Sequence, residues 1–124
     1  MDDRQILLEP SVICDYLDAL DPPRMPFPTV GKDRWDALLL QGLADGAMTA
    51  MGRLFADEQR PDKERSSLTM TRFAQTRDTA IAWLETCALG EVHSIGEISV
   101  AAFLGYLDFR WPDRDWRAPR PPPV

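Results

Sequence analysis

The side chains that could do acid–base or nucleophilic chemistry in this 124-residue chain are few and widely spaced. His93 is the only histidine, so a serine or cysteine nucleophile would have to use this one residue as its base. Ser94 lies beside it, but Glu97 follows three residues later, a spacing that commits the serine hydroxyl to a helix-capping box. The carboxylates are spaced as on a solvated surface and form no recognisable acid–base pair. We therefore expect no catalytic set in this chain.

The two cysteines, Cys14 and Cys87, each stand among apolar residues at helical spacing, with no C-x-x-C motif. A metal site built on them and on His93 is therefore not expected. We predict two buried, free thiols, which is typical of a cytoplasmic protein. Redox signalling through either thiol is an alternative that burial would disfavour, because reactive thiols need exposure.

The overall charge and hydropathy exclude several classes of partner. A net charge of −6 argues against nucleic acid and against anionic membrane surfaces, because little positive charge is left to neutralise phosphates. No apolar run approaches the roughly 20 residues that span a bilayer. The first residues, MDDRQ, are acidic where a secretory signal is basic. We expect a cytoplasmic protein with neither nucleic acid nor a membrane as partner.

The prolines divide the chain into the elements that must position these residues. They cluster in residues 22–28 and 112–123, which leaves two long proline-free blocks in which helices can form. Apolar residues recur at helical spacing in four segments. These predicted helices are 11–20, 32–60, 61–89 and 94–110, with an extended linker over 21–31. The pattern predicts an all-α bundle.

The segment 94–110 is the predicted central helix. We expect the Ser94 hydroxyl to accept the N–H of Glu97, and the Glu97 carboxylate to accept the N–H of Ser94. Behind this structural N-cap, apolar residues lie on every side of the helix. That pattern is typical of a helix in the middle of a bundle, so we expect neighbours on all sides of it.

A face of small side chains runs along the predicted helix 32–60. Gly42, Gly46 and Thr49 share this face, with Asp45 beside them and Gly52 further on. Glycine inside a helix costs about 1 kcal/mol relative to alanine, so these glycines indicate close approach by a neighbour. The neighbour is either another helix of the same chain or a second subunit across a two-fold axis. Asp45 is expected either to cap a neighbouring backbone or to reach a ligand.

Several motifs, in matching order and spacing, resemble the C-terminal helical domain of bacterial glutathione S-transferases. These motifs are Leu8–Asp18, Leu43–Gly46, Glu58–Pro61, Ser94–Glu97, Ala101–Arg110 and Asp115–Arg117. The resemblance implies a helical bundle of that family's C-terminal type over residues 32–124. It also implies that residues 1–20 are a remnant of the preceding thioredoxin-like domain, namely its last helix, and that 21–31 is the linker.

The resemblance also implies a place for glutathione. In the family, an acidic residue followed by serine at the start of that last helix holds the γ-glutamyl end of glutathione. Glu9 matches the acid, but Pro10 stands at the serine position, so Ser11 could substitute only if the helix start shifts by one residue. Asp45 would face the subunit interface or the partner's glutathione.

A second implied site is the hydrophobic pocket for the electrophile, which Met48, Met51, Phe55 and Tyr106 would border. The family's thiol-activating residue belongs to a part of the fold before the start of this chain. The resemblance therefore implies a truncated transferase with no catalytic residue and no resident cofactor, and with glutathione as its co-substrate. The alternative is a non-catalytic module for dimerisation or partner binding. Either way, we expect a homodimer or a partner protein that covers the exposed apolar face.

Overall fold

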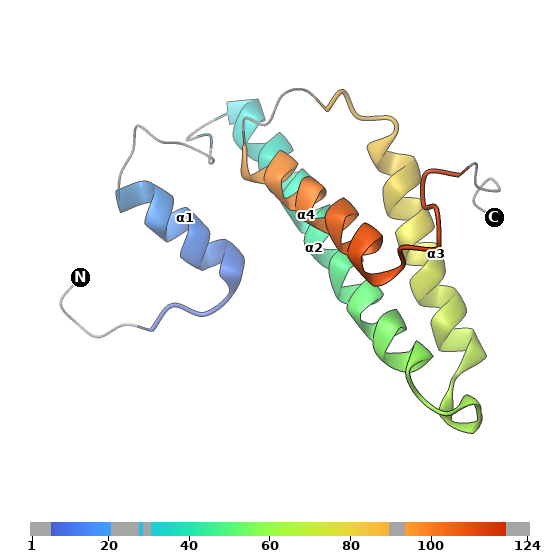
Figure 1. Ribbon diagram of the computed structural model, residues 1–124. Coiled ribbons are helices and arrows are strands. Elements are labelled where there is room, and N and C mark those ends of the chain that lie inside the picture. The colour runs from blue at the N-terminus through green and yellow to red at the C-terminus, as the bar shows by residue number, and fades with distance from the viewer. Residues whose placement is uncertain (1–5, 21–27, 29–30, 90–93, 119–124) are drawn as a thin grey trace.

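The computed structural model describes residues 6–20, 28, 31–89 and 94–118, and no strand occurs in these ranges. The elements are α1 (Pro10–Leu20), α2 (Gly31–Glu58), the short 3-10 turn η2 (Asp62–Glu64), α3 (Ser67–Leu84) and α4 (Ile95–Arg110). Helices α3 and α4 pack along α2, while α1 stands apart from this three-helix body (Figure 1). The predicted all-α fold is confirmed.

The core forms where α2 meets its two neighbours. The inner face of α2 is built largely from alanines, including Ala44 and Ala47, which are almost completely buried and let the partner helices come close. Met51 of α2 and Phe103 and Leu107 of α4 are the largest fully buried side chains. Burial of apolar surface at this three-helix contact is the main stabilising contribution to the fold.

The prediction that α4 is enclosed on all sides is wrong for the part of the chain that the structure describes. One face of α4, including Val100 and Phe103, is buried against α2. The opposite face is open, since Ile98 is 44% exposed and Phe109 is 73% exposed. The reason is geometric: α3 packs on α2 and not on α4, so α4 has only one described neighbour. Apolar residues around a helix do not reveal how many neighbours it has.

The serine cap of α4 forms, with a different hydrogen-bond pattern from the expected box. The Ser94 side chain accepts the N–H of Gly96 at 3.2 Å, rather than the N–H of Glu97. The Ser94 hydroxyl donates to the Glu97 carboxylate. Ser94 is buried, and these two hydrogen bonds satisfy its hydroxyl, so burying this polar group leaves no hydrogen bond unmade.

The close contact that the glycines indicate lies at Gly96 and not at the small-residue face of α2. A Cβ at Gly96 would lie 2.8 Å from the carbonyl oxygen of Ala37 and 2.8 Å from the Cβ of Leu40. Around Gly42 and Gly46, a Cβ would meet no atom of the described chain within 4 Å. A neighbouring helix of the same chain therefore does not explain these two glycines among the described residues.

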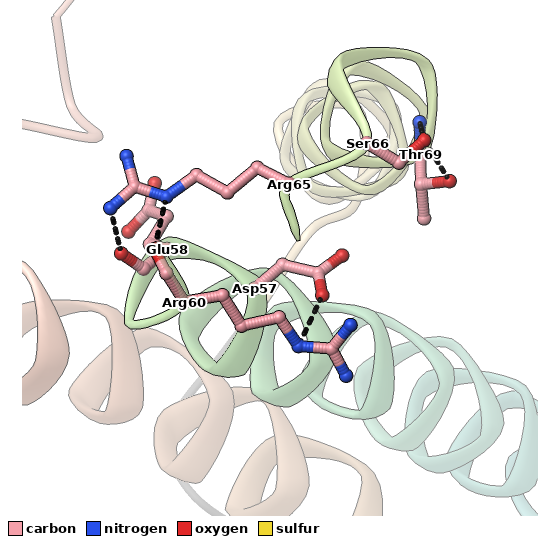
Figure 2. Close-up of polar contacts among 6 residues, drawn as sticks. All are labelled: Asp57, Glu58, Arg60, Arg65, Ser66 and Thr69. Atoms are coloured by element: carbon pink, nitrogen blue, oxygen red, sulfur yellow. Dashed lines mark hydrogen bonds and ion pairs between the residues drawn. The ribbon is translucent and has the colours of Figure 1, made fainter. Parts of the chain in front are cut away.

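The turn between α2 and α3 is fixed by polar side chains, and it shortens both predicted helices. The Arg65 guanidinium donates to the carbonyl oxygens of Glu58 at 2.8 Å and Arg60 at 2.7 Å, which satisfies the free carbonyls at the end of α2 (Figure 2). Ser66 then caps α3 by accepting the N–H of Thr69 at 3.3 Å. The expected helix 61–89 is therefore a short turn followed by α3.

The two thiols are both free, but the prediction of burial is wrong: Cys14 is exposed and Cys87 is partly buried. Cys14 lies on α1, which has no described helix packed against it. His93 and most of the predicted linker 21–31 lie outside the described residues.

Candidate functional site

The start of α1 has an unusual backbone. Glu9 has a φ of 72°, in the left-handed region that non-glycine residues rarely adopt. Its carbonyl oxygen accepts the N–H of Ile13 at 3.1 Å, which makes Glu9 the residue that opens the helix. Pro10 takes the first helical position, where its missing N–H costs nothing. Ser11 is then the second helical residue, so the helix start is not shifted. Backbone strain of this kind costs on the order of 1–3 kcal/mol and is typical of functional sites.

Asp45 of α2 lies near this helix start. Partial loss of water raises the pKa of Asp45, and the negative charge of Glu9 raises that pKa further. The two carboxylates, one from each side of the space between α1 and α2, are therefore close enough to repel each other. Neither has an ion-pair partner among the described residues. Glu9 and Asp45, two of the three residues predicted to hold glutathione, are therefore within electrostatic range of each other, and their role in binding glutathione stays a prediction.

An ion pair that the sequence analysis missed holds α1 near α2. Arg34, in the first turn of α2, donates to Asp15 of α1 at 3.1 Å and also contacts the carbonyl oxygen of Pro28 at 3.4 Å. Both charged side chains are partly shielded from solvent. Residues paired across a proline-rich linker leave no periodic signal in the sequence, so this link could not be read from spacing.

The residues predicted to border the electrophile pocket fall at two depths. Met51 is fully buried in the core, and Met48 is partly buried beside it. Phe55 and Tyr106 are partly exposed and meet around Trp111, whose ring lies edge-on to both at centroid distances of 5.8 and 6.4 Å. The pocket itself stays a prediction, with Phe55 and Tyr106 as its partly exposed members.

A cation that the sequence analysis did not single out lies among these rings. The guanidinium carbon of Arg110 lies 4.5 Å from the ring centroid of Phe55, 5.3 Å from that of Tyr106 and 5.0 Å from that of Phe109. Its Nε atom is buried with no hydrogen-bond partner. We call Arg110 and these three rings the Arg110 cluster. The spacing of tyrosine, phenylalanine and arginine at i, i+3 and i+4 in the sequence could have indicated it.

The carboxylate of Glu58, at the end of α2, is committed to other donors. It accepts the indole N–H of Trp111 at 2.7 Å and a guanidinium N–H of Arg114 at 2.7 Å. Burial alone would raise the pKa of Glu58, but the hydrogen bonds from Arg114 and Trp111 outweigh it and the pKa is lowered. This contact fastens the segment after α4 to the end of α2.

An open groove of about 560 Å³ runs between α2 and α3. Its α2 side is formed by the small residues Gly42 and Gly46 with Leu43. Its α3 side carries polar side chains, among them Arg72 and Thr76. The face of small residues is therefore one wall of a groove that no described part of the chain fills.

Neither a metal-binding cluster nor a membrane-spanning helix occurs among the described residues. No three histidine, cysteine, aspartate or glutamate residues within the described ranges gather to hold a metal ion. None of the helices described is both long enough and apolar enough to cross a membrane.

Comparison with known proteins gives matches among solved structures only. No protein-family model and no curated protein matches the chain. A glutathione transferase family member from Pseudomonas fluorescens Pf-5, solved with bound S-(propanoic acid)-glutathione, is 36% identical with a TM-score of 0.84. The match covers 94% of this chain and 61% of that chain. A structure of a glutathione transferase family member from the same organism with bound glutathione is 34% identical over 95% of this chain and 60% of that one, with a TM-score of 0.82.

A third structure extends the likeness in fold. Glutathione S-transferase from Methylobacillus flagellatus KT, with GSH bound, has a TM-score of 0.82 at 23% identity, over 94% of this chain and 61% of that one. The helices match the C-terminal part of these structures, so the predicted fold class is confirmed. The chain spans about three fifths of the length of these relatives.

Proposed function

We propose that this chain is a member of the glutathione transferase family, which its 36% and 34% identity to two solved structures supports. In this proposal it forms the helical side of a glutathione site and does not itself supply the group that activates the thiol. The observation that carries this proposal is the approach of Glu9, at the strained start of α1, to Asp45 on α2. The two structures of a family member from Pseudomonas fluorescens, one with bound glutathione and one with S-(propanoic acid)-glutathione, support the same ligand here.

The charges of the γ-glutamyl end of glutathione are complementary to the groups at the start of α1 and at Asp45. That end carries one ammonium and one carboxylate. Glu9 and Asp45, two carboxylates with no described cation between them, attract the ammonium. The first turn of α1 offers unpaired N–H groups, which attract the carboxylate. Pro10 removes one of the usual donors, so we expect weak binding.

We propose that the electrophile binds against the partly exposed rings of Phe55 and Tyr106, with Met48 nearby. Met51 supports this wall from beneath, since it is completely buried. The proposed organisation is that of the resemblance: residues 1–20 are a remnant of a thioredoxin-like domain, namely its last helix, 21–31 form the linker, and 32–124 form the helical domain. We also propose a cytoplasmic location, because both cysteines are free.

Calorimetric titration with glutathione tests the proposal. We expect saturable binding by the wild-type chain, and at least a threefold weaker affinity in Asp45→Asn, because the ammonium loses one of its two carboxylates. The matched control is Asp113→Asn, which removes one exposed negative charge at the other end of the bundle and should leave the affinity unchanged. Equal affinities for all three proteins would contradict the proposed site.

A second candidate function is dimerisation without chemistry, and the groove between α2 and α3 favours it. The exposed Gly42 and Gly46 leave room along α2 for the helix of a second copy to pack closely. Gly46→Arg fills this space, while Gly46→Ala adds one methyl group where no described atom lies within 4 Å. Sedimentation velocity should show a wild-type dimer that Gly46→Arg converts to monomer. A wild-type chain that stays monomeric at high concentration would refute this candidate.

A further inference from the structure

The guanidinium of Arg110 has no anionic partner in the part of the chain that the structure describes. It makes no ion pair and no hydrogen bond to another side chain within the described ranges, and its contacts are the rings of the Arg110 cluster. Charged groups that lie partly inside a protein are normally paired, because losing water is costly for them. The rings compensate for part of this cost, since a cation is attracted to aromatic faces.

Two carboxylates close to the Arg110 cluster, Glu58 and Asp108, are held by other donors. Glu58 accepts hydrogen bonds from Trp111 and Arg114, both at 2.7 Å. Asp108 accepts a guanidinium from Arg117 through two bonds, both at 2.9 Å. Neither carboxylate can turn toward Arg110 without breaking such bonds. No carboxylate of the described chain pairs with Arg110, so an anion from outside it can complete the cluster.

The accessible part of the Arg110 guanidinium fits one kind of anion. Its Nε atom is buried, but the residue as a whole is only partly buried, which leaves the two terminal NH2 groups as the donors for a ligand. Two parallel N–H groups of this kind match the two oxygens of a carboxylate. The surrounding rings favour a ligand with an apolar body, and the net charge of −6 disfavours anions with several charges.

We propose that Arg110 binds the carboxylate of an apolar organic acid, with the body of that molecule against the rings of Phe55 and Tyr106. This inference deepens the proposed function, because these two rings belong to the wall on which the electrophile is placed. It identifies the second substrate as a carboxylate-bearing electrophile and gives Arg110 the role of selecting it.

Benzoate and its neutral counterpart benzamide test the inference without glutathione, so the result is independent of the proposed glutathione site. Quenching of tryptophan fluorescence follows binding, because Trp111 lies beside Phe55 and Tyr106. We expect wild-type protein to bind benzoate at least fivefold more tightly than benzamide. This preference should fall below twofold in Arg110→Gln and be restored only in part by Arg110→Lys, which keeps the charge but loses the planar pair of donors. The control Arg53→Gln removes an exposed cation elsewhere on α2 and should keep the full preference.

Two results would overturn the inference: equal affinities of wild-type protein for benzoate and benzamide, or an unchanged preference in a folded Arg110→Gln. If phosphate competes with benzoate as strongly as acetate does, the site binds anions in general, and this result would also overturn the inference. If Arg110→Gln does not fold, the side-chain Nε–H resonance of Arg110 in wild-type protein tests the inference instead. It must shift saturably with benzoate and stay in place with benzamide. Glutathione binding with no benzoate preference would reject this inference alone and leave the proposed function standing.

Discussion

Replacing Gly96 with alanine probes the contact between α4 and α2 on which the bundle depends. The added methyl group would lie 2.8 Å from the carbonyl oxygen of Ala37 and 3.1 Å from its Cα. These neighbours are backbone atoms of α2, which cannot move aside as a flexible side chain can. The start of α4, including its Ser94 cap, would have to shift away from α2.

The expected cost follows from this overlap. Forcing one extra carbon into a close-packed contact costs about 1–3 kcal/mol. With a urea dependence of about 1.5 kcal/mol per molar, a loss of about 2 kcal/mol lowers the denaturation midpoint by roughly 1 M. That is a large share of the roughly 5–15 kcal/mol by which a domain of this kind is stable.

The matched control is Gly105→Ala on the same helix. Gly105 is exposed, and a Cβ there would meet no described atom within 4 Å. This variant should be more stable than wild type by up to about 1 kcal/mol, because alanine favours the helix. Urea unfolding followed by circular dichroism measures both variants. If Gly96→Ala is stabilised to the same extent as Gly105→Ala, the close packing of α4 on α2 is refuted.

Three further predictions concern single polar groups. Ser94→Ala should destabilise by about 1 kcal/mol through loss of the cap of α4, and unchanged urea unfolding would show that the cap contributes nothing. The pKa of Glu58 is lowered from its ordinary 4.5, so its carboxylate stabilises the fold above that pH and the contribution disappears as the pH falls through the lower folded value. Glu58→Gln should therefore destabilise at pH 7 and lose less stability than wild type between pH 5 and about pH 3, as thermal unfolding across pH can show; parallel curves would contradict this. The pKa of Asp45 is raised, so its ionised form opposes folding at pH 7 and its protonated form does not. Asp45→Asn should raise the melting temperature at pH 7, with a gain that shrinks toward pH 3, and a constant gain would show that burial and the charge of Glu9 do not raise the pKa of Asp45.

The helices themselves follow from the sequence, whereas their ends depend on single side chains. Proline-free blocks and apolar periodicity correctly predict α2 and α4. The expected helix 61–89 begins too early, because Arg65 caps the end of α2 and Ser66 begins α3, and it also extends beyond Leu84, where α3 ends. Such local hydrogen bonds compete with helix propensity and have no period that a pattern could reveal.

The candidate site could be predicted only in part. The resemblance singled out Glu9 and Asp45, and the electrostatic effect of one on the other emerged only in three dimensions. The small-residue face of α2 was correctly recognised as unusual, but its described surroundings are empty, and Gly96 makes the close contact instead. Arg110 was overlooked because an arginine at the end of a helix is ordinarily explained by the helix dipole. Only its distances to three rings and its unpartnered Nε distinguish it.

The most direct test of the central claim is a map of backbone amide shifts during titration with glutathione. The account predicts saturable shifts at Ser11 and Asp45, on the two sides of the space between α1 and α2, with the amide of Asp113 unchanged. Asp45→Asn should weaken the response at Ser11 as well, because both sides hold the same end of the ligand. Shifts confined to residues outside this space, or an unaltered response at Ser11 in Asp45→Asn, would contradict the claim that these carboxylates hold glutathione.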